Sequence, residues 1–354
     1  MKIFTIMDQY DYEELIFIHD KSTNLKGLIC IHDTTLGPAL GGLRFWKYEK
    51  EEDAIIDVLR LARGMTYKAA VSNLSLGGGK AVIIGDPKKD KSEALLRMFG
   101  KFVESLKGRY ITAEDVGISV EDMCHIRKET KYVAGLPENM GGSGDPSPMT
   151  ARGVFYGLKA ALEEVYGTCS FVGKVIALQG LGHVGYNLAR LLLEDGARVY
   201  ACDIDEEKVE KAKRELGIIP VPFKEIYSVE CDIFSPCALG GILNKETIPK
   251  LTCRIVGGAA NNQLKSEEDG KLLHEKGILY LPDYVINAGG LINVSCEIEG
   301  YSREKALEKV KGIYTNIKKV IQIAKEEKIP TYLAANRLAE ERILMVRKQR
   351  KIYL

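Results

Sequence analysis

The chain is 354 residues long, which is more than a single hydrophobic core usually serves, so we expect two domains. Hydrophobic residues make up 45% of the chain, charged residues make up 28%, and the formal net charge is +1. A charge so close to zero argues against a nucleic-acid-binding protein and against attraction to an anionic membrane surface.

Two further features of the sequence indicate where the protein works. No apolar run approaches the roughly 18 to 20 residues of a membrane-spanning helix, and the first residues, MKIFTIMDQYDYEEL, become acidic before a signal-peptide core forms. The eight cysteines are scattered without a CxxC pair, which argues against a disulfide framework and against a zinc site. We therefore expect a soluble, cytoplasmic protein that binds no metal.

The first part of the chain has the pattern of alternating helices and strands. The predicted elements are a short helix beginning at Asp11, a strand over 27–32, a helix over 51–73, a strand over 81–84, a helix over 93–106 and a strand over 110–112. Ser92 stands where a helix N-cap is expected, and Ser119 with Asp122 forms a capping-box pattern before another helix. The strand over 110–112 delivers Asp115 to its carboxyl end.

The stretch Gly64–Lys80, GMTYKAAVSNLSLGGGK, carries Lys68 and Lys80, the second at the end of a glycine run. Glycines let the backbone approach a ligand closely, so Lys80 is expected to face a pocket that suits an anionic substrate. Mutual repulsion and partial desolvation would push one lysine toward the neutral form that a general base needs. The structural alternative is a solvated helix charge followed by a simple turn.

The segment Glu138–Pro148, ENMGGSGDPSP, is the clearest linker in the chain and is predicted to mark a domain boundary. Beyond it, short apolar strands alternate with amphipathic helices, which is typical of a doubly wound parallel sheet. The strand candidates are 175–178, 199–202, 233–234, 254–256 and 279–281. The tail from about Ser302 is helical in character, with one break at Pro330.

A dinucleotide-binding pattern follows the first strand of this second part. Gly180, Gly182 and Gly185 form GLGHVG between the strand KVIALQ and the helix YNLARLLLEDG. The glycines permit a tight turn and let backbone N–H groups approach a pyrophosphate at the positive end of the helix. Asp203 follows the next strand at about the 20-residue spacing where a carboxylate accepts the adenine-ribose hydroxyls.

An acidic residue at position 203 repels a 2′-phosphate, so the pattern favours NAD over NADP, and Asp205 nearby is a second candidate for this role. Two structural alternatives stay open at this point. The glycines form a turn that binds no nucleotide, or Asp203 only caps the end of its strand.

Five motifs in order closely resemble the amino-acid dehydrogenase family of glutamate, leucine, valine and phenylalanine dehydrogenases. They are GPALGGLRFW at 37–46, GMTYKAAVSNLSLGGGK at 64–80, ITAEDVG at 111–117, GLGHVG at 180–185 and INAGGLINV at 286–294. The resemblance covers essentially the whole chain and is strongest to the leucine dehydrogenase branch. It implies reversible oxidative deamination of an L-amino acid to its 2-oxo acid and ammonia, with NAD as cofactor.

The resemblance also assigns the catalytic residues. It implies that Lys68 binds the substrate α-carboxylate, Lys80 activates the water that attacks the imine, and Asp115 exchanges protons with the amino group. These types suit the chemistry, because a cation holds a carboxylate and a lysine of lowered pKa accepts a proton. The structural alternative for Asp115 is an acidic residue at the N-terminus of the helix beyond Gly117.

On the cofactor side, the resemblance extends the site beyond the glycines. Asn261 and Asn262 fall where the family has an asparagine near the nicotinamide ribose or the substrate amine, and which of the two serves stays open; both are also ordinary turn formers. Cys237 and Ala238 resemble the strand-end backbone beside the cofactor, although Cys237 also reads as a buried thiol. The cofactor-binding residues expected in full are Gly180, Leu181, Gly182, His183, Val184, Gly185, Asp203, Ile204, Cys237, Ala238, Asn261 and Asn287.

The substrate pocket is expected to be apolar. By the same resemblance, glutamate dehydrogenases have the triplet Lys-Gly-Gly where this chain has Leu40, Gly41 and Gly42. A leucine offers no partner to the distal carboxylate of a glutamate substrate. Burying that carboxylate unpaired would cost several kcal/mol, so glutamate is not expected as the substrate. The resemblance adds Met65, Ala113, Leu291 and Val294 as pocket walls and Asn262 as a substrate contact; plain core packing is the alternative for each wall residue.

One pocket position departs from the leucine type. By resemblance, leucine dehydrogenases have Val at the position of Leu291, whereas a Leu there is similar to the phenylalanine enzymes. Those enzymes, however, tend to have Gly at the position of Ala113. Because Ala113 is retained, the pocket should be no larger than the leucine type. A methylene is worth about 1 to 3 kcal/mol of discrimination, so we expect activity on leucine, isoleucine and valine, and weak activity on phenylalanine.

The expected architecture is therefore α/β with two domains. An N-terminal α/β substrate and oligomerisation domain over 1–140 is followed by a Rossmann-type doubly wound NAD-binding domain over 145–325, and C-terminal helices over about 330–354 return to the first domain. The family forms homo-oligomers, often octamers. Alternatives are a phenylalanine or other 2-amino or 2-hydroxy acid dehydrogenase, and a non-enzymatic NAD sensor.

Overall fold

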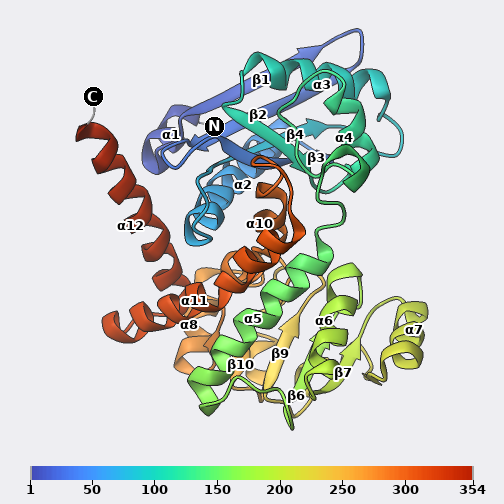
Figure 1. Ribbon diagram of the computed structural model, residues 1–354, viewed down its shortest axis with the longest axis vertical. Coiled ribbons are helices and arrows are strands. Elements are labelled where there is room, and N and C mark those ends of the chain that lie inside the picture. The colour runs from blue at the N-terminus through green and yellow to red at the C-terminus, as the bar shows by residue number, and fades with distance from the viewer. Residues whose placement is uncertain (1, 353–354) are drawn as a thin grey trace. The chain divides into compact units, whose positions relative to one another are not determined.

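The computed structural model describes residues 2–352, which form two compact units (Figure 1). Unit 1 consists of the described chain up to Asp145, together with Val294–Ser302 and the chain from Ala339 onward. Unit 2 consists of Pro146–Asn293 and Arg303–Leu338. Val294–Ser302 was predicted in the second domain and belongs to unit 1; the division there falls inside a helix, where the sequence carries no linker signal.

Unit 1 is built on a mixed five-stranded sheet in the order β1-β2-β4-β3-β5. Its strands are β1 (Glu14–Asp20), β2 (Leu25–Asp33), β3 (Ala39–Trp46), β4 (Gly77–Ile84) and β5 (Tyr110–Glu114). The central strand β3 runs parallel to β4 and β5, whereas β2 is antiparallel to β1 and β4. The carboxyl ends of β3, β4 and β5 therefore lie at one edge of the sheet.

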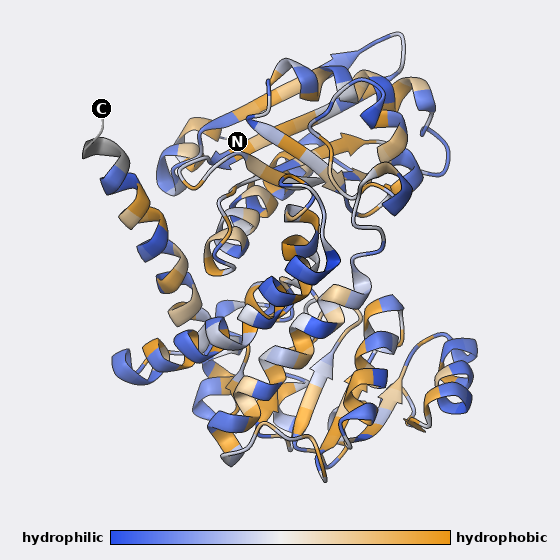
Figure 2. Cartoon of the chain, viewed as in Figure 1, coloured by the Kyte–Doolittle hydropathy of each residue, from blue (hydrophilic) through white to orange (hydrophobic). Residues whose placement is uncertain are grey.

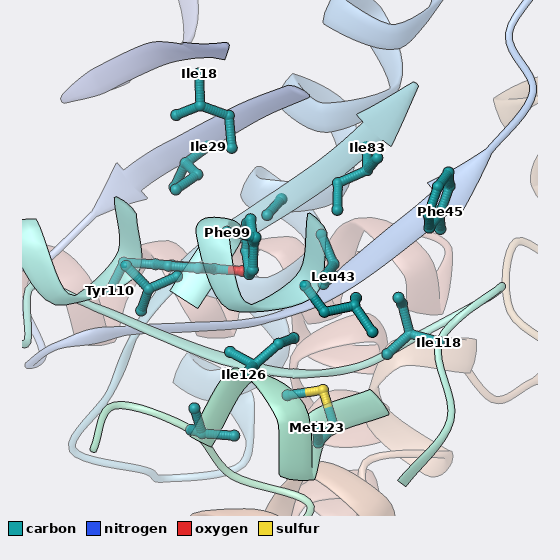
Figure 3. Close-up of a cluster of buried hydrophobic side chains, with 14 of the residues drawn as sticks. Ile18, Ile29, Leu43, Phe45, Ile83, Phe99, Tyr110, Ile118, Met123 and Ile126 are labelled. Atoms are coloured by element: carbon teal, nitrogen blue, oxygen red, sulfur yellow. The ribbon is translucent and has the colours of Figure 1, made fainter. Parts of the chain in front are cut away.

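Helices cover both faces of this sheet. They are α1 (Ile3–Tyr10), α2 (Glu51–Val71), α3 (Glu93–Ser105) and α4 (Val120–Arg127), and a 3₁₀ turn, η1, spans Glu138–Met140. One core, shown in part in Figure 3, joins Leu43, Ile83 and Tyr110 of the strands to Phe99 of α3 and Met123 of α4. The opposite face packs Cys30 and Val82 against the apolar side of α2. Alternate residues of each strand therefore face α2.

Two local features of unit 1 differ from the prediction. The segment after Asp11 was predicted as a helix, but Glu14–Asp20 forms the edge strand β1 and pairs with β2 across a turn that Asp20 stabilises by accepting from the Thr23 backbone N–H at 2.8 Å. The strand predicted over 81–84 begins earlier, because β4 starts at Gly77, so the structural alternative of a turn at 77–79 is excluded. A Cβ on Gly78 would lie 2.0 Å from the backbone nitrogen of Thr66, so tight packing against α2 requires the glycine.

The predicted helix signals of unit 1 are confirmed. The Ser92 hydroxyl accepts a hydrogen bond from the Leu95 N–H at 3.2 Å at the start of α3. Ser119 and Asp122 form the expected capping box at α4. Near the end of α2, Arg342 of the C-terminal helix donates hydrogen bonds to the carbonyl oxygens of Ala70, at 2.7 Å, and Leu74, at 2.8 Å. This arginine therefore binds the backbone where α2 ends and the chain turns toward β4.

Unit 2 contains a fully parallel six-stranded sheet in the order β11-β10-β9-β6-β7-β8, which confirms the doubly wound prediction. Its strands are β6 (Val175–Gln179), β7 (Arg198–Cys202), β8 (Ile219–Pro220), β9 (Ile233–Pro236), β10 (Ile255–Val256) and β11 (Leu279–Tyr280). The strand order reverses between β6 and β9. Ligands of such sheets bind at the carboxyl ends of the strands at this reversal.

Helices and short turns connect these strands and continue into the tail. They are α5 (Ser147–Tyr166), α6 (His183–Glu194), α7 (Glu206–Leu216), η2 (Ile226–Ser228), η3 (Ile248–Lys250), α8 (Glu267–Glu275), α9 (Asp283–Ile286), α10 (Gly289–Ser295), α11 (Arg303–Glu327) and α12 (Thr331–Ile352). Figure 2 shows apolar residues gathered in the strands and polar residues on the outer sides of the helices. Among the residues described, no helix is both long and apolar enough to span a membrane.

Candidate active site

A buried ion pair links two strands of the unit 1 sheet. Lys80 lies on β4, on the face that packs against α2, and only 4% of its surface is exposed. Its Nζ lies 3.1 Å from Oδ1 of Asp115, which directly follows β5. Strand β3 lies between β4 and β5, and at Gly42 a Cβ would come within 2.8 Å of the Asp115 Cβ. The glycine at position 42 therefore leaves the space that the ion pair occupies.

Asp115 does not cap the helix that follows it. The residue before α4 is Ser119, whose side chain accepts the hydrogen bond from the helix. The Asp115 carboxylate instead uses its second oxygen, Oδ2, to accept a hydrogen bond from Nε of Arg44 at 2.9 Å. Of the two predicted roles for Asp115, the structural alternative at a helix N-terminus is therefore excluded by its contacts.

Arg44 is a site residue that the sequence prediction missed. Its Nη1 donates to Oδ2 of Asp57 on α2 at 2.8 Å, and the hydroxyl of Tyr48 donates to the same oxygen at 2.7 Å. A signal was available, because Arg44 stands two residues after Gly42 on one strand and thus projects from the same face as the glycine. Its partner Asp57 gave no such signal, because it lies on a helix whose packing the sequence does not specify.

The pair is tuned by its surroundings. Burial lowers the pKa of Lys80, and the nearby Arg44 charge lowers it further, while Asp115 only partly offsets both effects. Burial alone would raise the pKa of Asp115, but Lys80 and Arg44 more than offset it and hold that pKa below its usual range. The arrangement therefore favours an ionised carboxylate beside a lysine that gives up its proton more readily than usual.

Small and apolar residues surround the ion pair on the same sheet. Leu40 is almost wholly buried on β3, and Gly42 pairs in register with Ala113 of β5. A Cβ on Gly41 would lie 1.7 Å from the carbonyl oxygen of Gly79, so the neighbouring strand excludes any side chain there. Leu40, Gly41, Gly42 and Ala113 thus lie close together on β3 and β5, and their part in a substrate pocket stays a prediction.

Two further predicted residues lie on α2. Met65 and Lys68 are both half-buried and are one helical turn apart, so they lie on one side of the helix. Between them, Thr66 is fully buried, where its hydroxyl forms a 2.8 Å hydrogen bond with Nδ1 of His32. This contact joins α2 to β2 and so helps to position Lys68. The role of Lys68 as carboxylate ligand stays a prediction.

In unit 2, the glycine motif follows β6 at the reversal of strand order. Gly180 has φ +100° and would contact Ala238 if it carried a Cβ, while a Cβ on Gly185 would lie 1.9 Å from the carbonyl oxygen of Gly180. At Gly182 a Cβ would meet nothing within 4 Å, and no side chain caps the helix α6 that begins there at His183. The motif therefore leaves open backbone and an uncapped helix end, which suits a pyrophosphate.

The carboxylate predicted to bind ribose lies beside this motif. Asp203 follows β7, and its Oδ2 accepts a hydrogen bond from the Leu181 N–H at 2.7 Å, while Oδ1 accepts one from the Asp205 N–H at 3.0 Å. Asp203 thus orders the glycine loop, and the next residue, Ile204, leaves 83% of its surface exposed. Cys237 follows β9 and donates its backbone N–H to the Gln179 carbonyl at 2.7 Å, which places it beside the end of β6.

Asparagines gather near the ends of β10 and β11. The side chain of Asn287 donates hydrogen bonds to the carbonyl oxygen of Ala259, at 3.1 Å, and to Oδ1 of Asn261, at 2.8 Å. Asn287 is buried, and its own Oδ1 has no hydrogen-bond partner within the described part of the chain. Both Asn261 and Asn262 are exposed, and Asn262 has φ +51°; the hydrogen bond shows that Asn261 is the one joined to Asn287.

The remaining two pocket candidates lie on α10. Leu291 is half-buried in unit 2, and Val294, which belongs to unit 1, is 8% exposed. Being one helical turn apart, they lie on the same side of α10. Their part in a substrate pocket stays a prediction.

These features define a class of protein. A parallel sheet with a glycine cradle at its reversal point, joined to an α/β unit that buries a lysine–carboxylate pair, is the plan of a two-domain dehydrogenase that acts through a dinucleotide.

Comparison with known proteins identifies the family. A profile described as the dimerisation domain of Glu/Leu/Phe/Val dehydrogenases matches residues 14–132, and one described as Glutamate/Leucine/Phenylalanine/Valine dehydrogenase matches 141–208 and 203–351. The chain therefore belongs to the Glu/Leu/Phe/Val dehydrogenase family.

Individual relatives agree over the whole length. The chain is 58% identical to a leucine dehydrogenase of Thermoactinomyces intermedius, covering 100% of this chain and 97% of the relative, and 56% identical to one of Geobacillus stearothermophilus, covering 100% and 96%. Among solved structures, an L-tryptophan dehydrogenase from Nostoc punctiforme is 48% identical with a TM-score of 0.87, covering 98% of this chain and 99% of that one.

Proposed function

We propose that the protein catalyses the reversible oxidative deamination of a branched-chain L-amino acid, leucine foremost and also isoleucine and valine, to the 2-oxo acid and ammonia. The full-length identity to leucine dehydrogenases supports this reaction. The observation in the structure that carries it is the Lys80–Asp115 pair, because deamination needs a base and a proton-exchanging carboxylate side by side.

NAD is the cofactor that the unit 2 site fits. The glycine cradle with its uncapped helix end would hold the pyrophosphate, Asp203 the adenine ribose, and the Asn261–Asn287 pair, with its unpartnered buried Oδ1, the nicotinamide side. Ile204, Cys237 and Ala238 would complete the contacts. When bound, NAD supplies the hydride acceptor for the oxidation of the substrate.

The chain's own residues perform the proton chemistry. Lys68 pairs with the α-carboxylate of the substrate and so orients its 2-carbon. Lys80, whose pKa burial lowers, takes the proton of the water that attacks this carbon and then stabilises the developing negative charge on oxygen. Asp115, held ionised by its two cationic partners, accepts a proton from the amino group and returns it to the departing ammonia.

The side-chain pocket favours aliphatic substrates. Leu40 takes the position of the lysine that pairs with glutamate in glutamate dehydrogenases, and Met65, Ala113, Leu291 and Val294 are apolar. A glutamate carboxylate would be desolvated there without a partner. Leucine, isoleucine and valine should therefore be turned over well and phenylalanine weakly.

We further propose a cytoplasmic homo-oligomer. The match of residues 14–132 to a profile described as a dimerisation domain supports self-association, and an octamer is the form that the leucine branch suggests. All eight cysteines are free thiols, in keeping with a reducing compartment.

The test measures NADH formation by the purified protein with NAD and each of five substrates: leucine, isoleucine, valine, phenylalanine and glutamate. Lys80→Ala is compared with Lys89→Ala, which removes an exposed lysine soon after the same strand. We expect turnover on the aliphatic three that is lost only in Lys80→Ala. A higher kcat/KM for phenylalanine than for leucine would favour a phenylalanine dehydrogenase, and silence on all five with intact NAD binding would favour a sensor.

A further inference from the structure

We propose that Arg44 is a positioning residue for this reaction, which, anchored by Asp57, holds the Asp115 carboxylate against Lys80 while the lysine exchanges its proton. The inference rests on the proposed function. It concerns a residue to which the sequence assigned no role.

The hydrogen bonds divide the two oxygens of Asp115 between two cations. Oδ1 lies 3.1 Å from Nζ of Lys80, and Oδ2 accepts from Nε of Arg44 at 2.9 Å. With both oxygens engaged from different strands, the carboxylate is fixed in rotation as well as in position. Such a fixed orientation matters because a displacement of about 1 Å in a reacting group costs on the order of 100-fold in rate.

Arg44 is itself held from its far end. Its Nη1 donates to Oδ2 of Asp57 at 2.8 Å, and the Tyr48 hydroxyl donates to the same oxygen at 2.7 Å. The planar guanidinium thus bridges two carboxylates with different nitrogens, which a lysine ammonium at the end of a flexible chain reproduces poorly. Arg44 therefore ties the sheet to α2 through the Asp115 carboxylate and Asp57.

Charge compensation is the second reason for an arginine at this position. If Arg44 were absent, a neutral Lys80 would leave Asp115 as a largely buried anion with no cation beside it. An unpaired buried charge is strongly disfavoured. Without another cation, Lys80 would therefore keep its proton. Because the guanidinium remains protonated across the working pH range, Asp115 keeps one cationic partner throughout the cycle.

The groups that face the pair set the direction of the pH effects. Arg44 on β3 and Asp57 on α2 lie on the same face as Lys80 and Asp115, while Tyr110 and Glu114 on β5 interact with Asp115 only electrostatically, with Asp145 and Glu297 near Glu114. Arg44 lowers the pKa of both Lys80 and Asp115, whereas Asp57 raises the pKa of Lys80. Removing the arginine and removing Asp57 should therefore shift the Lys80 titration in opposite directions.

A hollow beside Arg44 allows a direct rescue experiment. It has a volume of about 570 Å³ and is lined by Arg44, Trp46, Tyr48, Asp57, Arg60 and Val116. The hollow is larger than a guanidinium ion, and the Arg44 side chain forms part of its wall. Truncating Arg44 to alanine would extend this hollow toward Asp115, so added guanidinium should enter and restore the missing cation.

The kinetic test compares Arg44→Ala, Arg44→Lys and Asp57→Asn with the wild type, and uses Arg60→Ala as the matched control. Arg60 also approaches Asp57, at 3.5 Å, but its side chain is 64% exposed. We expect Arg44→Ala to lower kcat about 10- to 100-fold with a smaller change in KM. Millimolar guanidinium should restore part of kcat in Arg44→Ala only, and Arg44→Lys should retain an intermediate activity.

The pH profile separates positioning from a merely structural role. The acidic limb of kcat/KM should move to higher pH in Arg44→Ala and to lower pH in Asp57→Asn, because the two variants remove charges of opposite sign. Asp57→Asn also serves as the test if Arg44→Ala fails to fold. Unshifted limbs in both variants, or loss of activity without rescue, would overturn the inference while leaving the proposed reaction intact.

A measurement that needs no turnover tests the inference even if the wild type is inactive on every amino acid. In protein labelled with ¹³C at aspartate carboxyls, the Asp115 signal is assigned by its loss in Asp115→Asn, and its titration midpoint should rise in Arg44→Ala. If the wild type is inactive on every amino acid, the proposed function fails, and this midpoint alone decides the inference. An unchanged midpoint overturns it.

Discussion

Lys80 and Asp115 meet at 3.1 Å across an intervening strand, and Gly42 on that strand carries no side chain to separate them. The site therefore depends on a glycine as much as on its charged residues. It also depends on the parallel pairing of β3 with β4 and β5, in which Gly42 pairs with Ala113, two residues before Asp115.

Gly42→Ala should disrupt this pair. The new methyl group would lie 2.5 Å from the Glu114 carbonyl oxygen and 2.8 Å from the Asp115 Cβ, so the carboxylate must move. We expect kcat/KM for leucine to fall about 10- to 100-fold with unchanged NAD affinity. The control is Gly64→Ala on α2, where the methyl meets nothing within 4 Å; that variant should keep full activity and gain about 0.5 to 1 kcal/mol of stability. Equal activities would contradict the prediction.

Leu40→Lys should change substrate preference. The buried leucine would be replaced by an ammonium that lacks a partner until a substrate supplies a carboxylate. We expect the ratio of kcat/KM for glutamate over that for leucine to rise at least tenfold, mainly through loss of leucine activity. Leu40→Met, which conserves volume, should keep the leucine preference. If leucine remains preferred to the same degree in Leu40→Lys, residue 40 does not line the pocket.

Asp203→Ser should weaken discrimination between the two dinucleotides. The carboxylate both accepts the Leu181 N–H and stands where the ribose hydroxyls are expected. We expect Kd for NAD to rise about tenfold, and binding of NADP to become measurable because the repelling charge is gone. Asp205→Asn is the control, since Asp205 caps α7 by accepting the Glu207 N–H and asparagine preserves that cap. NADP binding that appears equally in the control would assign the repulsion to Asp205.

His32 should make the stability of unit 1 depend on pH. Burial lowers the pKa of His32 to about 4. Between pH 6.5 and 4 the unfolded chain then binds a proton that the folded chain does not, so stability is full above pH 6.5 and is lost as pH falls. The loss amounts to about 3 kcal/mol at pH 4.

The measurement is thermal unfolding at several pH values of the wild type and of His32→Gln, which has no proton to gain. Groups common to both proteins cancel in the difference. The wild type should lose Tm relative to the variant as the pH drops from 7 to 4. Parallel Tm curves would mean that His32 is protonated in the folded protein.

Local signals in the sequence were sufficient for much of the fold. The caps at Ser92, Ser119 and Asp122, the glycine motif at Gly180–Gly185 and the alternation of short strands with helices all depend on residues close together in the chain. Such signals act through backbone hydrogen bonds and side-chain periodicity, which a sequence displays directly.

Other features were decided only by tertiary structure. Glu14–Asp20 is a strand because β2 is there to pair with it, and the glycines at 77–79 stay extended because α2 and the neighbouring strands leave no room for side chains.

Local sequence patterns pointed to Lys80 and Asp115 as site residues and to the family to which the chain belongs. The three-dimensional packing was needed to show that Arg44 and Asp57 complete the network, since one lies on β3 and the other on α2. The physical reason is that charge interactions and burial depend on distances in space, and these distances arise from packing between elements that no local pattern specifies.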